Sequence, residues 1–313
     1  MKNRLLICTQ TGDLFDECSA DYEYLNKNYK MLKEYGFEAI DLNLDHLLTY
    51  NDMISGKPCL WDKSLDEIYE HFEITKKALF ENGIIVSQIH ASFPLYIEGN
   101  EEINEYLIKV MEKTLAVSKY LDCPVVVAHP CPIEDKEKER EINLGMYENM
   151  IPAAKKYGVK VCLENLFMAF NDKPIEGICS TAEEACWYIN TLNEKAGEEI
   201  FGFCLDIGHA NLTSRNIKNF ILTLGHHLTC LHIHDNDGIY DFHLMPYTQA
   251  RIWGQKCCTD WEGMIEGLKK IDYQGNLSFE AYQAFNRFPV EVRPEALRLL
   301  SAIGRYFRNR ILS

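Results

Sequence analysis

The chain has 313 residues, of which 47% are hydrophobic and 25% are charged, as is ordinary for a soluble globular protein. This length suits one large domain or two ordinary ones. The formal net charge of −15 and the isoelectric point near 5.1 argue against a general nucleic-acid binder, because such a surface repels polyanions. No apolar stretch approaches about 18 residues, so we expect no membrane span.

The 12 cysteines indicate reduced thiols and not a disulfide framework. Cys8, Cys162, Cys204 and Cys230 lie inside apolar strand-like runs, where a free thiol behaves as a small hydrophobic group. The sequence has no Cys-x-x-Cys pair, which argues against a zinc ribbon. The N-terminal segment has too short an apolar run for a signal peptide. We therefore expect a cytoplasmic protein.

Two hydrophobic periods alternate along the chain. Near-continuous apolar runs predict β-strands at residues 5–9, 38–44, 84–90, 124–129, 160–165, 201–206, 228–234 and 276–281. Apolar residues at three- and four-residue spacing predict helices at roughly 21–35, 65–82, 101–121, 142–157, 182–195, 215–223, 260–270 and 293–309. Several of these helices end on a glycine suited to cap them, such as Gly83 and Gly158.

This alternation predicts a parallel sheet covered by helices, and eight strands are the number that closes a barrel. A doubly wound open sheet is the alternative. Such a sheet commonly has a Gly-x-Gly-x-x-Gly phosphate loop after its first strand, which residues 8–17 (CTQTGDLFDE) lack. We therefore expect an α/β protein with a single (β/α)8 TIM-barrel domain over residues 1–313, with longer excursions at 44–64 and 235–259.

Ionisable side chains end six consecutive predicted strands, the third to the eighth. They are His90, His129, Glu164, Asp206, His232 and Glu280. In a TIM barrel the C-terminal strand ends meet at one mouth, and buried charges there are costly unless they meet a cation or one another. The pattern therefore predicts a shared metal-centred site and not six separate capping residues.

The residue types favour a hard divalent ion. Two glutamates, one aspartate and one histidine form an oxygen-rich set that suits Mn²⁺, Mg²⁺ or Co²⁺, while further strand-end histidines could recruit zinc or a second ion. His232 and His234 lie on the same face of a strand, so alternation does not decide between them. Histidines in helical or pre-strand contexts are expected to be surface or packing residues: His46, His71, His226 and His227.

Four motifs in combination resemble those of the xylose isomerase-like TIM-barrel superfamily, over essentially the whole chain. They are ENL (164–166), LDIGHANL (205–212), HIHDNDG (232–238) followed by DFH (241–243), and TDWEGMIEGLKKIDYQGNLSFE (259–280). The superfamily holds sugar isomerases and epimerases, inosose dehydratases, C-glycoside deglycosidase subunits and the DNA-repair nuclease endonuclease IV. The proline- and glycine-rich loop usual before the tryptophan is replaced by MPYTQARIWG (245–254).

The resemblance implies one divalent ion, with Mn²⁺ as the first expectation, on Glu164, Asp206, His232 and Glu280. His232 takes the ligand position if the family spacing His-x-x-Asp-Asn applies, and His234 is the substitute in another register. Glu164 and Glu280 are then the catalytic base and acid. Residues expected to contact the substrate are His209, His90, His129, His243 and Trp253. His90, His129, His209, Asp241 and His243 also resemble zinc ligands of the nuclease.

The implied function is a metal-dependent isomerase or epimerase of a sugar, sugar phosphate or polyol, acting by proton transfer through an enediolate. A lyase on the same scaffold stays open, either an inosose-type dehydratase or a C-glycoside deglycosidase subunit with a small partner subunit. An endonuclease IV-like nuclease is the remaining alternative, which the charge of −15 opposes. We expect a small sugar-type substrate and no nucleic-acid or membrane partner; a homo-oligomer stays open.

Overall fold

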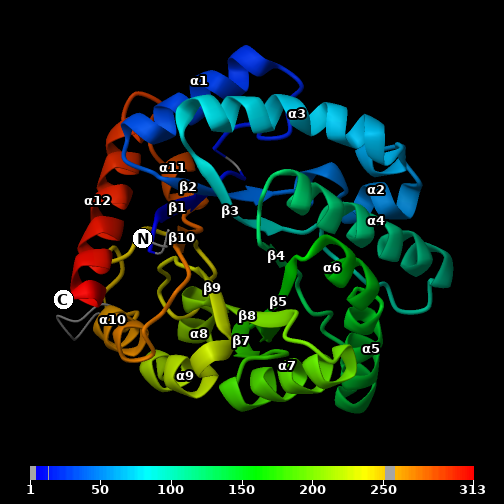
Figure 1. The fold of residues 1–313 in the computed structure, drawn as a ribbon. Helices are drawn as coiled ribbons and strands as arrows, with labels where there is room; N and C mark the ends of the chain where they lie inside the picture. Colours follow the sequence, from blue (N-terminus) through cyan, green and yellow to red (C-terminus); the bar gives the residue numbers. More distant parts are fainter. Residues whose placement is uncertain (1–4, 13, 251–257) are drawn as a thin grey trace.

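The predicted barrel is present in the computed structural model, which describes residues 5–12, 14–250 and 258–313 (Figure 1). Eight strands hydrogen-bond in the order β10-β1-β2-β3-β4-β5-β8-β9, and neighbouring strands are parallel. A parallel bridge between Ile233 and Phe279 joins the last two strands. The Ile233 N–H donates to the Ser278 carbonyl over 2.8 Å there, so the sheet closes on itself.

The barrel strands agree with all eight predicted strands. They are β1 (Ile7–Gln10), β2 (Ala39–Asn43), β3 (Ile85–His90), β4 (Val125–Val127), β5 (Lys160–Glu164), β8 (Phe201–Asp206), β9 (Leu228–His232) and β10 (Leu277–Phe279). A second, antiparallel pair, β6 (Phe167–Phe170) and β7 (Lys173–Glu176), forms a hairpin after β5. This hairpin was not predicted, because its four-residue strands are largely exposed and lack a buried apolar face.

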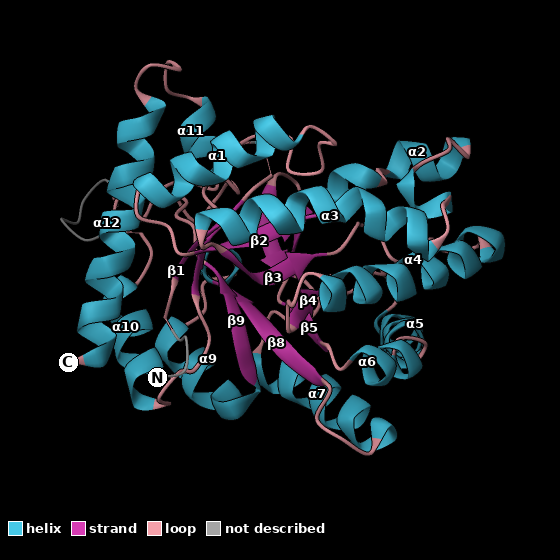
Figure 2. Ribbon diagram, turned by 45° about the horizontal axis from the view of Figure 1, so that its top comes forward, coloured by secondary structure: helices cyan, strands magenta, loops and turns pink. Residues whose placement is uncertain are grey.

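Helices surround the strands on the outside of the barrel (Figures 1 and 2). They are α1 (Tyr22–Glu34), α2 (Tyr50–Ser55), α3 (Leu65–Asn82), α4 (Glu101–Tyr120), α5 (Lys136–Glu148), α6 (Ile151–Tyr157), α7 (Ala182–Ala196), α8 (Ile207–Leu212), α9 (Ile217–Leu224), α10 (Trp261–Lys270), α11 (Tyr282–Asn286) and α12 (Arg293–Leu312). Within the described ranges, no helix has the length and apolarity needed to cross a membrane.

The predicted helix at 142–157 is two helices, α5 and α6. Pro152 stands in the first turn of α6, where its missing N–H costs no intrahelical hydrogen bond, so it begins a new helix. Helix α5 starts earlier than predicted, inside the acidic run 134–141. Glu139 of that run is buried, and its carboxylate accepts a hydrogen bond from the Ile133 N–H over 2.9 Å. The two glycine caps are confirmed, since Gly83 and Gly158 take left-handed backbone conformations.

The core has an outer layer between strands and helices and a small inner layer inside the barrel. The inner layer contains the buried residues Val125, Val127, Cys162, Cys204 and Cys230. The cysteines among the described residues are free. Burial raises the pKa of the Cys204 and Cys230 thiols well above the usual value, so these thiols stay protonated and pack as small apolar groups.

Helix α12 packs closely on the barrel at Gly304. A Cβ atom built there would lie 2.8 Å from Cγ2 of Ile7 and 2.9 Å from Cε2 of Phe279. We therefore expect Gly304→Ala to destabilise the fold by about 1–3 kcal/mol, because β1 and β10 must shift to admit the methyl group. The measurement is the urea midpoint of unfolding.

Gly145→Ala in α5 is the matched control. A Cβ atom at Gly145 meets no other atom within 4 Å, so the helix propensity of alanine should leave stability unchanged or raise it by up to about 1 kcal/mol. Equal midpoints for the two variants would show that α12 does not approach the barrel this closely.

Candidate functional site

The C-terminal ends of the strands surround a cleft of about 310 Å³. Its lining residues are Gln10, Gly12, Asn43, Asp45, His46, His90, His129, Glu164, His209, Asp241, His243, Glu280 and Tyr282. Six of the predicted site residues therefore reach the cleft directly from strand ends or the loops that follow: His90, His129, Glu164, His209, His243 and Glu280. Asp206 and His232 lie deeper and are fully buried. The mouth of the barrel thus brings the predicted side chains together.

The four predicted metal ligands form one compact group. Glu164, Asp206, His232 and Glu280 each offer a ligand atom, and these atoms lie within 4.8 Å of one another. Nδ1 of His232 is buried and lies 3.0 Å from Oε2 of Glu164 and 3.4 Å from Oε2 of Glu280, at ion-pair distance from both carboxylates. A buried imidazole nitrogen that faces two carboxylates, with the Asp206 carboxylate in the same group, fits a divalent cation.

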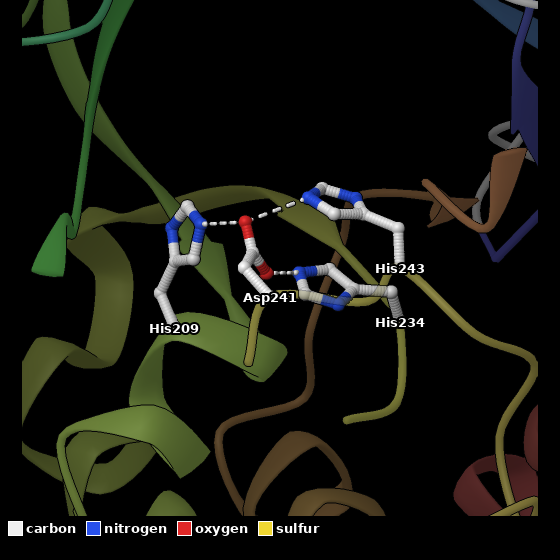
Figure 3. Close-up of side chains that lie close together, drawn as sticks. All are labelled: His209, His234, Asp241 and His243. Carbon is white, nitrogen blue, oxygen red and sulfur yellow. Dashed lines mark hydrogen bonds and ion pairs between the residues drawn. The ribbon is translucent and has the colours of Figure 1, made fainter. Parts of the chain in front are cut away.

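A second group consists of His209, His234, Asp241 and His243, which Figure 3 shows. Oδ2 of Asp241 is 3.0 Å from Nε2 of His243 and 3.5 Å from Nε2 of His209. Oδ1 of Asp241 is 3.7 Å from Nε2 of His234. His234 also lies 3.0 Å from Oδ1 of Asp206, so the two groups adjoin through that carboxylate. The structure thus groups His232 with the predicted ligands and His234 with Asp241.

The remaining two predicted histidines form a third group with Glu164. Nε2 of His90 is 3.0 Å from Nε2 of His129. Nε2 of His129 is in turn 3.1 Å from Oε2 of Glu164. Glu164 therefore belongs both to this group and to the predicted metal-ligand group.

Three of these histidines donate Nδ1–H to a backbone carbonyl. His90 donates to Ala91 over 3.0 Å, His209 to Asn165 over 2.9 Å and His243 to Glu280 over 2.9 Å. Because a carbonyl oxygen only accepts, the proton is on Nδ1 and each Nε2 is directed at the groups described above. This is the arrangement in which proteins usually hold metal-binding imidazoles.

Burial and ion pairing act in opposite directions on the carboxylates. Desolvation disfavours the charged form of Glu164, but His232 and His129 outweigh it and hold its pKa well below the usual range. Desolvation likewise acts on Asp206, where His209 and His234 lower the pKa. Both carboxylates are therefore ionised at neutral pH.

Two imidazoles, those of His209 and His243, have raised pKa values instead. Desolvation alone would lower the pKa of His209, but Asp206 and Asp241 raise it well above the usual value. For His243, the attraction of Glu280 and Asp241 exceeds desolvation and raises the pKa to about 9. Without a metal, His209 and His243 therefore hold protons as counter-charges to the carboxylates.

The first two strands also contribute side chains to the site, which the sequence pattern did not predict. Nε2 of Gln10, the last residue of β1, donates to Oε1 of Glu280 over 2.7 Å. Asn43 ends β2, and Asp45 and His46 follow it at the cleft. His46 is exposed as expected, but it borders the cleft, which was not predicted. The signal was present in NLDH (43–46), a polar run directly after an apolar strand.

Aromatic rings contact two histidines of the cleft, and one of these aromatic residues, Tyr282, also lines it. The ring of Phe167, on the β6–β7 hairpin, lies 5.2 Å from that of His209, and the ring of Tyr282 lies 4.7 Å from that of His243. Trp253, a predicted substrate contact, lies outside the described residues.

Solved structures with a similar fold cover nearly the whole chain. 3-Keto-D-glucoside 4-epimerase from E. coli has a TM-score of 0.69 at 18% identity, over 97% of this chain and 100% of that one. D-psicose 3-epimerase from Clostridium cellulolyticum H10, solved with D-tagatose, has 0.69 at 16%, over 97% and 99%. An IolI protein with a bound zinc atom has 0.63 at 19%, over 96% of each chain.

A curated relative is also similar along most of its length. The uncharacterised protein y4fM of Sinorhizobium fredii is 21% identical over 293 residues, which cover 82% of this chain and 81% of the relative. The family model described as xylose isomerase-like TIM barrel matches residues 29–302. The chain therefore belongs to the xylose isomerase-like TIM-barrel family.

Proposed function

We propose that the protein is a divalent-metal-dependent isomerase or epimerase of a sugar or sugar-like polyol. The observation that carries this proposal is the pair of carboxylates, Glu164 and Glu280, that both face Nδ1 of His232 at the floor of the cleft. The family and the epimerases among the proteins of similar fold support this reaction class.

The residues fit the metal that this chemistry needs. Three carboxylates and one imidazole form an oxygen-rich set, for which Mn²⁺ is the first expectation, with Mg²⁺, Co²⁺ and Zn²⁺ as alternatives. An IolI protein of similar fold binds a zinc atom, which supports a metal-dependent reaction here. Such an ion would supply Lewis-acid polarisation of a substrate carbonyl and an adjacent hydroxyl.

Glu164 and Glu280 would exchange the proton. One carboxylate removes a proton from the carbon next to the carbonyl, and the other returns a proton to the resulting enediolate. Gln10 holds Oε1 of Glu280 by a 2.7 Å hydrogen bond and leaves Oε2 facing the centre. His129 contacts Oε2 of Glu164, and His209 lies 3.6 Å from Oε1. These imidazoles are placed to hydrogen-bond substrate hydroxyls beside the reacting carbon.

Replacing either carboxylate tests these roles. In D₂O with Mn²⁺ and a panel of ketoses and keto-polyols, the wild-type protein should introduce deuterium next to the carbonyl. Glu164→Gln and Glu280→Gln should each slow this exchange by about 100- to 10,000-fold, because an amide cannot carry the proton. Glu198→Gln is the control, since Glu198 is an exposed partner of Lys155 outside the cleft.

The metal content of each variant is measured in the same samples, so that loss of the ion and loss of the proton carrier are told apart. Wild-type exchange rates in a metal-loaded Glu164→Gln or Glu280→Gln protein would refute the role of that residue. Ultraviolet absorbance from an unsaturated product, or from a released aglycone, would assign the lyase reaction to the same proton removal.

A second candidate is an endonuclease IV-like phosphodiesterase. The observation that favours it is the presence of two further groups able to hold an ion, at His90–His129–Glu164 and around Asp241. The net charge of −15 opposes the approach of DNA. Elemental analysis of the purified protein separates the two functions: the first proposal expects about one tightly bound ion per chain. Three zinc ions with cleavage of abasic DNA would establish the nuclease.

Metal binding should depend on pH through His232. Burial disfavours its charged form, but Glu164 and Glu280 raise its pKa well above the usual value, so Nδ1 still carries a proton at neutral pH in the metal-free protein. A metal ion that binds Nδ1 must displace that proton, so a higher pH favours metal binding. The apparent Mn²⁺ affinity should therefore increase roughly tenfold per unit between about pH 6 and pH 8. Isothermal titration in two buffers measures the released proton, and a pH-independent affinity would contradict this assignment.

A further inference from the structure

Asp41 is a carboxylate deep inside the barrel that the chemistry above does not use. It lies within β2 and is fully buried. Its Oδ2 is 3.0 Å from Nε2 of His232. The same oxygen accepts hydrogen bonds from Nε2 of Gln88 over 2.9 Å and from Oγ of Ser278 over 3.4 Å. Its Oδ1 has no hydrogen-bond partner.

Burying a carboxylate such as that of Asp41 is costly unless it meets a counter-charge. Gln88 and Ser278 are neutral donors, and a neutral amide oxygen at position 41 could accept from them equally well. Within the described part of the chain, the ion-pair partner of Asp41 is His232, and no lysine or arginine is paired with it. The carboxylate of Asp41 therefore interacts electrostatically with the imidazole of His232.

The contact also decides which nitrogen of His232 faces the cleft. Nε2 of His232 is the ring nitrogen at hydrogen-bond distance from Oδ2 of Asp41, the contact through which a carboxylate commonly holds the N–H of a metal-binding imidazole. Nδ1 is then the nitrogen directed at Glu164 and Glu280. His209 and His243 have the opposite orientation and are held through Nδ1 by neutral carbonyls.

We propose that Asp41 is a positioning residue for the metal centre. It fixes the ring of His232 with Nδ1 towards Glu164 and Glu280, and its charge makes that nitrogen a stronger donor to a cation. Gln88 holds Asp41 in turn, and its Nε2 also lies 3.4 Å from the Leu231 carbonyl, next to His232 in β9. The inference rests on the proposed function, because it takes His232 as a metal ligand.

The test is the affinity of the metal-free protein for Mn²⁺, measured by competition with a chromophoric chelator. Asp41→Asn keeps the shape and one acceptor but removes the charge. Its affinity should be about 10- to 100-fold weaker than that of the wild type, as for loss of other groups that support a metal ligand. In a His232→Ala background, Asp41→Asn should change the affinity by less than about twofold, because residues that act through one another are not additive.

Glu139→Gln is the control for losing a buried carboxylate elsewhere. Glu139 is fully buried but is bonded to Ile133 and Lys136 on the helical side of the barrel. Its replacement should lower the melting temperature and leave Mn²⁺ affinity unchanged. A Zn²⁺-loaded sample labelled with ¹⁵N-histidine gives an independent readout: the Nε2–H proton of His232 should be protected from exchange, and Asp41→Asn should move its resonance upfield.

Each outcome has a distinct meaning. Unchanged affinity in Asp41→Asn, together with a clear loss in His232→Ala, would refute the role of Asp41 and leave the metal site standing. An equal loss in both backgrounds would show that Asp41 does not act through His232. If His232→Ala itself binds Mn²⁺ as tightly as the wild type, the proposed ligand set fails and this inference with it. A His232 that carries its proton on Nδ1 in the Zn²⁺-loaded protein would also refute the inference.

Discussion

The site depends on four buried carboxylates and a half-buried fifth, Asp241, at one mouth of the barrel, without a lysine or arginine paired to any of them among the described residues. These carboxylates are Asp41, Glu164, Asp206, Asp241 and Glu280, and the ion-pair partners recorded for them are histidines. Only imidazole protons or metal cations can therefore balance their charge. Unlike a guanidinium, both kinds of counter-charge can be exchanged with solvent, so the arrangement suits metal binding and proton transfer.

The barrel holds the side chains of this site in fixed positions. Most of the titratable atoms are held from behind by a group that leaves one atom facing the centre: a carbonyl for His209 and His243, and Gln10 for Glu280. These supports come from strands and strand ends, whose positions are set by the closed hydrogen-bond ladder. Donors and acceptors placed in advance require little reorganisation when a substrate arrives. Because these supports are rigid, the closely spaced carboxylates and imidazoles keep their positions in the folded protein.

The sequence predicts the barrel well because fully buried parallel strands are nearly continuous apolar runs, and such runs end abruptly at Glu164 and Asp206. The sequence does not predict residues whose roles depend on contacts between distant parts of the chain. Gln10 is not a typical ligand or acid–base residue, and Asp41 lies inside a strand instead of at its end. Their roles arise from contacts with residues 191 or more positions away in the sequence, which periodicity does not show.

The sequence pattern also does not decide whether His232 or His234 joins the predicted metal ligands. Strand β9 ends at His232, so the alternation of faces no longer fixes where His234 points. The ring of His234 instead occupies space above Gly208, where a Cβ atom would lie only 1.9 Å from its Cε1. Any side chain at position 208 would push this ring away from Asp206 and Asp241. The glycine of LDIGHANL thus separates the two histidines into different groups, because its missing side chain leaves the room that one of them fills.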